Sequence, residues 1–80
     1  SESPMTYILD NEPRNKHICA YIERLIELGR DVCIWPDNIK EKDINDMAYT
    51  MSTRKIQKII DVNTYNGLKA KLRFTEWRKI

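Results

Sequence analysis

The first third of the chain alternates between short apolar runs and helical spacing. Residues 6–9, Thr-Tyr-Ile-Leu, form an apolar and partly β-branched run that ends in a breaker sequence, which predicts a short buried strand. In residues 16–28, Ile and Leu recur every three or four positions, as they do on one face of a helix. Asn15 can cap the start of this helix, and Gly29 can take the left-handed conformation after its end.

A second apolar run from Asp31 to Trp35 predicts another strand, which Pro36 ends. Strand, helix and strand in this order make a βαβ unit, in which the two strands are parallel neighbours. The predicted fold class is therefore α/β: a βαβ unit with parallel strands, followed by C-terminal helices.

The next segment begins with a polar loop over 37–42. Asp43 is the expected cap of a short helix that runs to about Thr50, with Asp46 in the capping-box position. Ser52 can cap a further helix over 53–61, whose inner face is formed by isoleucines at 56, 59 and 60.

The last part of the chain is ambiguous. Residues 63–67 have the composition of a turn. From 68 to 77, apolar residues alternate with basic ones as in a strand, but Ala, Leu, Lys and Arg favour a helix, which is the prediction preferred here.

Size and composition restrict what such a chain can do. Its 80 residues are 41% hydrophobic and 32% charged, which is typical of a small soluble domain, and no apolar run reaches membrane-spanning length. A chain this short buries only about 60% of its unfolded surface, so a catalytic role would be shared with further sequence. Cys19 and Cys33 have no metal-site spacing and are expected to be reduced core residues of a cytoplasmic protein.

The charge is unevenly distributed. Residues 1–53 hold six Lys or Arg against ten Asp or Glu, whereas residues 54–80 hold eight against two. An acidic N-terminal segment followed by a basic C-terminal segment suits a divalent-metal site beside a surface that contacts a polyanion. Solvated surface charge would produce the same distribution.

Acidic residues follow both predicted strands. In a parallel βαβ unit the carboxyl ends of both strands open at one edge, where ligands of α/β sheets bind. Asp10 and Glu12 follow the first strand, and in extended backbone their side chains would point the same way; Asp43 follows the second strand. Carboxylates suit Mg²⁺, but Asp10 and Glu12 are also good turn residues, and Asp43 is also a good helix cap.

These acidic motifs resemble those of a known family. The stretch Tyr-Ile-Leu-Asp-Asn-Glu-Pro-Arg at 7–14 resembles the segment that holds the metal-binding acidic pair of the Toprim domain in DNA primases of T-even-type phages. Lys-Asp-Ile-Asn-Asp-Met at 42–47 resembles their next acidic motif, and the tail from 67 to 80 is similar to their C-terminal end. The resemblance covers nearly the whole chain, and it implies a partial Toprim fold: a βαβ unit with a metal-site rim over 6–50, and a basic helical tail over 52–80.

The resemblance also implies which residues would do the chemistry. Asp10 and Glu12 match the acidic pair, with Glu in place of the commoner Asp, and Asp43 matches the later aspartate, flanked by Asn45 and Asp46. These would be the catalytic, metal-binding residues for Mg²⁺, with Mn²⁺ as a substitute, in RNA primer synthesis on single-stranded DNA. The family's early glutamate has no counterpart in residues 1–80, so the fragment alone is expected to be inactive. A Toprim nuclease remains an alternative.

The tail offers a second hypothesis from a different class. Lys69, Lys71, Arg73 and Trp77 could contact single-stranded template, with cations at phosphates and aromatic rings on bases. Arg14, just beyond the acidic pair, could meet a phosphate of the nucleic acid or balance the charge of the carboxylates. The alternative for the tail is a structural element that packs Leu72, Phe74 and Trp77 inward. The resemblance implies nucleotides, template DNA and the replicative helicase as partners, no membrane, and the cytoplasm of the infected bacterial host. A docking module without catalysis is the competing function.

Overall fold

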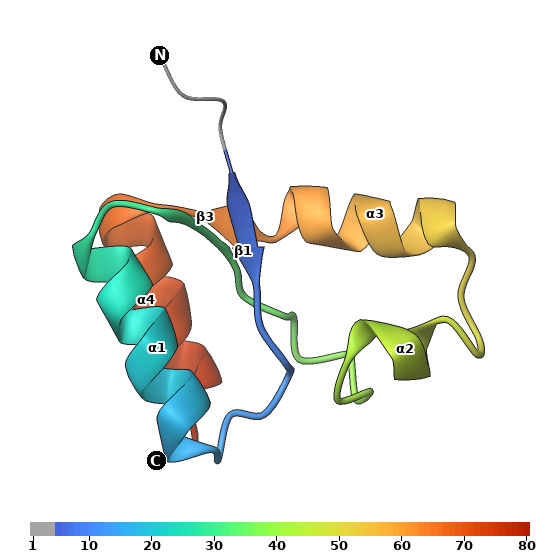
Figure 1. Ribbon diagram of the computed structural model, residues 1–80, viewed down its shortest axis with the longest axis horizontal. Helices are drawn as coiled ribbons and strands as arrows, with labels where there is room; N and C mark the ends of the chain where they lie inside the picture. Colours follow the sequence, from blue (N-terminus) through green and yellow to red (C-terminus); the bar gives the residue numbers. More distant parts are fainter. Residues whose placement is uncertain (1–4) are drawn as a thin grey trace.

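The computed structural model describes residues 5–80 as a small sheet with helices on both of its sides (Figure 1). In chain order the elements are β1 (Thr6–Ile8), α1 (Lys16–Glu27), β2 (Asp31–Cys33), α2 (Ile44–Met47), α3 (Thr53–Val62), β3 (Thr64–Tyr65) and α4 (Gly67–Trp77). Among these described elements, no helix has both the length and the apolar character needed to cross a membrane.

The three strands form one sheet in the order β1-β2-β3. β1 runs parallel to β2, with Tyr7 opposite Val32, and β3 runs antiparallel to β2, with Thr64 opposite Cys33. Because α1 connects the two parallel strands, the predicted βαβ unit and the α/β class are confirmed.

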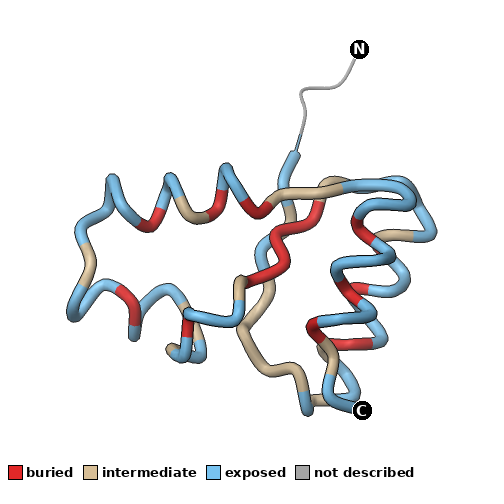
Figure 2. The backbone as a smooth tube through the Cα atoms, turned by 180° about the vertical axis from the view of Figure 1, so that it is seen from behind, coloured by how far each residue is buried: buried red, intermediate tan, exposed pale blue. Residues whose placement is uncertain are grey.

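β2 lies in the middle of the sheet and is buried on both faces, as the red central stretch in Figure 2 shows. Val32 and Ile34 belong to a core formed with α1 and α4, whereas Cys33 and Trp35 belong to a second core formed with α2 and α3. A strand covered on both faces has apolar residues at successive positions. This is why the segment from Asp31 to Trp35 does not alternate between apolar and polar residues.

The two cores differ in their other buried members. The α1 and α4 side contributes Cys19, Ile22, Leu25, Ala70, Phe74 and Trp77. The α2 and α3 side contributes Ile39, Met47, Ile56 and Ile60.

The helix starts follow the local signals in the sequence. The Asn15 side chain accepts hydrogen bonds from the amides of His17 and Ile18, at 2.9 and 3.1 Å. The Ser52 hydroxyl accepts one from the amide of Lys55 at 3.1 Å. Each cap satisfies backbone donors that the first helical turn leaves unpaired, so both predicted starts are confirmed.

Several boundaries differ from the prediction, among them the first strand, which ends at Ile8 rather than Leu9. The second strand ends at Cys33 rather than Trp35, α2 ends at Met47 rather than near Thr50, and residues 64–65 form β3 instead of part of a turn. β3 exists because the end of α3 lies against the free edge of β2, where the amide of Ile34 donates to the carbonyl of Asn63 at 2.9 Å. Two residues are too few to show a strand pattern in the sequence.

The segment 68–77 is helical, as preferred, and belongs to α4. Phe74 and Trp77 are buried, but Leu72 is 59% exposed, so its predicted inward packing is wrong. The helical repeat places Ala70, Phe74 and Trp77 on one face and turns Leu72 away from it, whereas strand alternation would have kept Leu72 with Ala70 and Phe74.

Candidate functional site

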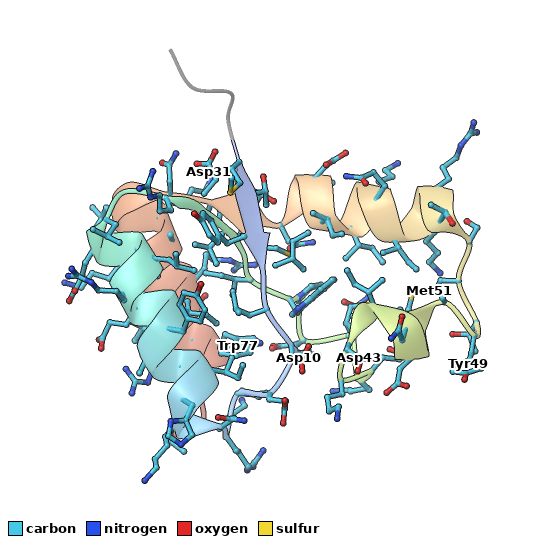
Figure 3. All side chains as sticks on the ribbon, viewed as in Figure 1. Asp10, Asp31, Asp43, Tyr49, Met51 and Trp77 are labelled. Atoms are coloured by element: carbon cyan, nitrogen blue, oxygen red, sulfur yellow. The ribbon has the colours of Figure 1, made fainter. Side chains whose placement is uncertain are left out.

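Two of the predicted acidic ligands lie at one pocket. Asp10 lies two residues past the end of β1, and Asp43 caps α2. Both line a pocket of about 230 Å³, together with Asn45 and the apolar side chains of Ile8, Leu9 and Ile44. Figure 3 shows Asp10 and Asp43 next to each other between the end of β1 and the start of α2. Two acids that are far apart in the sequence are therefore neighbours in the fold.

Both carboxylates keep free coordination capacity. Oδ1 of Asp43 accepts the capping hydrogen bond from the amide of Asp46 at 2.8 Å, which leaves its second oxygen available. Between residues 5 and 80, neither Asp10 nor Asp43 forms an ion pair with a Lys, Arg or His side chain. Each is partly buried. Two partly buried, uncompensated carboxylates make this pocket attractive to a cation.

Glu12 does not share this pocket. The backbone amide of Glu12 donates to the carbonyl of Asp10 at 2.9 Å, so the chain turns at residue 11 instead of staying extended. Alternation of side chains requires extended backbone, so the geometric reason for expecting Asp10 and Glu12 to point the same way does not apply at this turn. Within the described chain, no three acidic, His or Cys side chains are grouped closely enough to hold a metal ion.

The donor set at the pocket nevertheless fits a hard divalent cation. Mg²⁺ is commonly bound by one or two protein carboxylates, and water and phosphate oxygens fill the rest of its shell. Asp10 and Asp43 supply two carboxylates, and Asn45 adds an amide oxygen at the same pocket. The geometry therefore supports a two-carboxylate site.

Asn11 lies between Asp10 and Glu12 in the sequence, and its hydrogen bonds to a distant loop were not predicted. Its Nδ2 donates to the carbonyls of Ile39 and Glu41 at 2.9 and 3.1 Å, and its backbone amide donates to the carbonyl of Lys42 at 2.6 Å. In the sequence Asn11 reads as an ordinary turn residue. Nothing in a single sequence indicates partners about thirty positions away.

The predicted nucleic-acid residues of the tail do not form one surface. Trp77 is only 6% exposed and its indole belongs to the core, so its predicted stacking on bases is wrong. Lys69 and Arg73 lie over the ring of Tyr65, with the Lys69 Nζ 5.8 Å and the Arg73 Cζ 5.4 Å from the ring centroid. Lys71 instead lines a pocket beside Glu23 and Glu27 of α1.

Arg14 is exposed, and it makes no ion pair with another residue of the described chain. It does not compensate Asp10 or Glu12, and a phosphate contact by Arg14 stays a prediction.

Comparison with known proteins shows similarity to a phage DNA primase. No family model matches the chain. The chain is 32% identical over 77 residues to the DNA primase of Enterobacteria phage T4, and the match covers 92% of this chain and 22% of that protein. The chain thus spans about a fifth of the length of the primase that it matches. Over most of its length, this chain is related to a segment of a phage DNA primase.

Proposed function

We propose that this chain supplies the acidic, Mg²⁺-binding part of the catalytic site of a DNA primase, in a domain of the Toprim type. The observation that carries the proposal is the shared pocket of Asp10 and Asp43, two uncompensated acids that converge from separate elements. The relation to a phage DNA primase supports a primase rather than another nucleic-acid enzyme.

In this proposal Asp10 and Asp43 hold Mg²⁺, or Mn²⁺ in its place. A bound ion would neutralise the negative charge of nucleotide phosphates during primer synthesis. Asp43 also starts α2, so the capping bond that orders this helix fixes the carboxylate at the pocket. Glu12 stays a predicted ligand that rests on the family resemblance, because it is absent from the lining of this pocket.

The complete reaction requires more than this chain. With about a fifth of the primase's length, the chain alone is proposed to bind metal without making primers. The single-stranded template, the nucleotides and the replicative helicase would be partners of the whole enzyme in the cytoplasm of an infected bacterium.

Metal titration tests the proposal directly. Mn²⁺ added to the isotope-labelled chain should broaden the amide signals of residues 10–12 and 43–46 first. Asp10→Asn and Asp43→Asn should each abolish this selectivity, and Asp43→Asn retains a helix cap because Asn and Asp cap equally well. Asp31→Asn is the matched control, since Asp31 lies away from the pocket and bonds to Asn66 (Figure 3). Equal broadening in wild type and Asp10→Asn would refute the site.

A second candidate function is docking of single-stranded DNA. The observation that favours it is the cluster of Tyr65, Lys69 and Arg73, which combines an aromatic ring with two cations on one side of α4. Aromatic rings and cations are the groups that hold single strands without sequence preference.

A further inference from the structure

We infer that Asn11 is the positioning residue of the proposed metal site, and that Trp77 fixes its orientation. The inference rests on the proposed function, since it concerns how Asp10 and Asp43 are held together.

Asn11 lies between two segments of the site, and every polar group of its side chain is hydrogen-bonded. Besides the bonds to the carbonyls of Ile39, Glu41 and Lys42, its Oδ1 accepts a hydrogen bond from the indole Nε1 of Trp77 at 3.0 Å. Both amide donors, the amide oxygen and the backbone N–H are therefore paired. These side-chain bonds are partly buried, so water competes poorly for the same groups.

The position of these bonds relates directly to the two acids. Asn11 follows Asp10 in the chain, and Lys42 precedes Asp43. The 2.6 Å bond between the Asn11 amide and the Lys42 carbonyl thus joins the immediate neighbours of both carboxylates. The loop that carries Asp43 cannot move away from Asp10 without breaking this bond and both bonds of the Asn11 side chain.

The tryptophans act as donors that set the orientation of this segment. An indole N–H can only donate, so Trp77 holds Oδ1 of Asn11 toward α4 and leaves Nδ2 facing the loop carbonyls. The indole of Trp35 donates to the carbonyl of Leu9 at 2.9 Å, directly before Asp10. Both tryptophans of the chain therefore bond to the segment that presents Asp10.

Asn11→Asp separates positioning from charge. The substitution keeps an acceptor for Trp77 but removes both donors to the loop and adds a negative charge beside the site. Attraction alone would make Mn²⁺ bind more tightly. Positioning predicts weaker binding, by about 10-fold to 100-fold, the usual effect of losing an outer-shell partner.

The experiment measures Mn²⁺ affinity by water-proton relaxation in the chain and its variants. Asn11→Ala and Asn11→Asp should both weaken binding, and Trp77→Phe, which keeps a ring in the core but loses the N–H, should weaken it less. Asn66→Ala is the matched control, because Asn66 makes one exposed bond to Asp31. Amide signal dispersion verifies that each variant is folded. In the wild type, Mg²⁺ should also shift the indole N–H signal of Trp77.

The outcomes separate this inference from the proposed function. A wild-type chain without selective Mn²⁺ binding overturns the proposed function and, with it, this inference. Wild-type affinity in folded Asn11→Asp and Trp77→Phe overturns the positioning role alone. If Asn11→Ala and Asn11→Asp do not fold, Trp77→Phe decides: an unchanged affinity refutes the role, and a weaker one supports it.

Discussion

Cys33 and Cys19 are free, buried thiols on opposite sides of the sheet. Burial raises the pKa of Cys33 from 9.0 to about 12. Burial also raises the pKa of Cys19, although the nearby Arg78 guanidinium opposes this effect. Thiols with raised pKa values are poor nucleophiles, so both cysteines act as small apolar core residues, as the sequence predicted.

The raised pKa of Cys33 predicts a pH dependence of stability. Above pH 9 the thiol of the unfolded chain loses its proton while the folded chain keeps it, so ionisation favours unfolding. The free energy of unfolding should therefore fall between pH 9 and about 12, by at most about 1.4 kcal/mol per pH unit from this group. Urea unfolding of wild type and Cys33→Ala measures the difference. Parallel pH profiles of the two chains would contradict the prediction.

The acids illustrate which residue contacts a sequence can predict. Asp10 and Asp43 could be expected at one edge because parallel strands end there, and the pocket that they share agrees. The backbone turns between Asp10 and Glu12, and the role of Asn11 depends on partners in a distant loop and in α4. Such contacts arise only from the packed structure.

At the scale of elements, the cations of α4 fall on two faces. Lys69 and Arg73 are four residues apart and lie over Tyr65, whereas Lys71 faces Glu23 and Glu27 of α1. Arg73 also meets Glu76 at 3.3 Å, but this pair is exposed and contributes little. If α4 contacts a single strand, it does so on the face of Tyr65.

This arrangement predicts unequal effects of removing tail cations. Lys69→Ala combined with Arg73→Ala should weaken single-stranded DNA binding at about 50 mM salt and lower the salt slope by about 1 per lost phosphate contact. Lys55→Ala combined with Lys71→Ala removes two charges elsewhere and should have a much smaller effect. Fluorescence anisotropy with a labelled oligonucleotide measures both. Equal losses in the two double variants would mean that only overall charge matters.

Element types were easier to predict than their partners. Caps such as Asn15 and Ser52 accept hydrogen bonds from amides two or three residues away. The start of each helix can therefore be predicted from a few neighbouring residues. β3 forms only because the end of α3 meets β2, a contact between segments about thirty residues apart. Local signals do not contain that information.

At the scale of the molecule, β2 supports two cores of unequal extent. The α1 and α4 side has eight buried members and five partly buried residues packed against them. The other side has six buried members and two partly buried ones, and α2, which carries the capping Asp43, has only four residues. Local opening requires less free energy where fewer apolar contacts must break. We therefore expect the α2 and α3 side to open more easily than the α1 and α4 side. The proposed metal site connects the two sides, because Asp10 and Asn11 lie next to the α1 and α4 side and Asp43 caps α2.

Hydrogen exchange should reveal this difference and its link to metal. Amides of α1 and α4 should exchange more slowly than those of α2 and α3. Because an ion bound between Asp10 and Asp43 binds only where α2 is formed, Mg²⁺ should slow exchange in α2 in proportion to its saturation. Asp10→Asn should remove the metal effect and leave the ranking of the helices unchanged. If amides of α2 exchange as slowly as those of α1 without metal, the two sides open together. Metal binding would then not be coupled to a separate opening of α2.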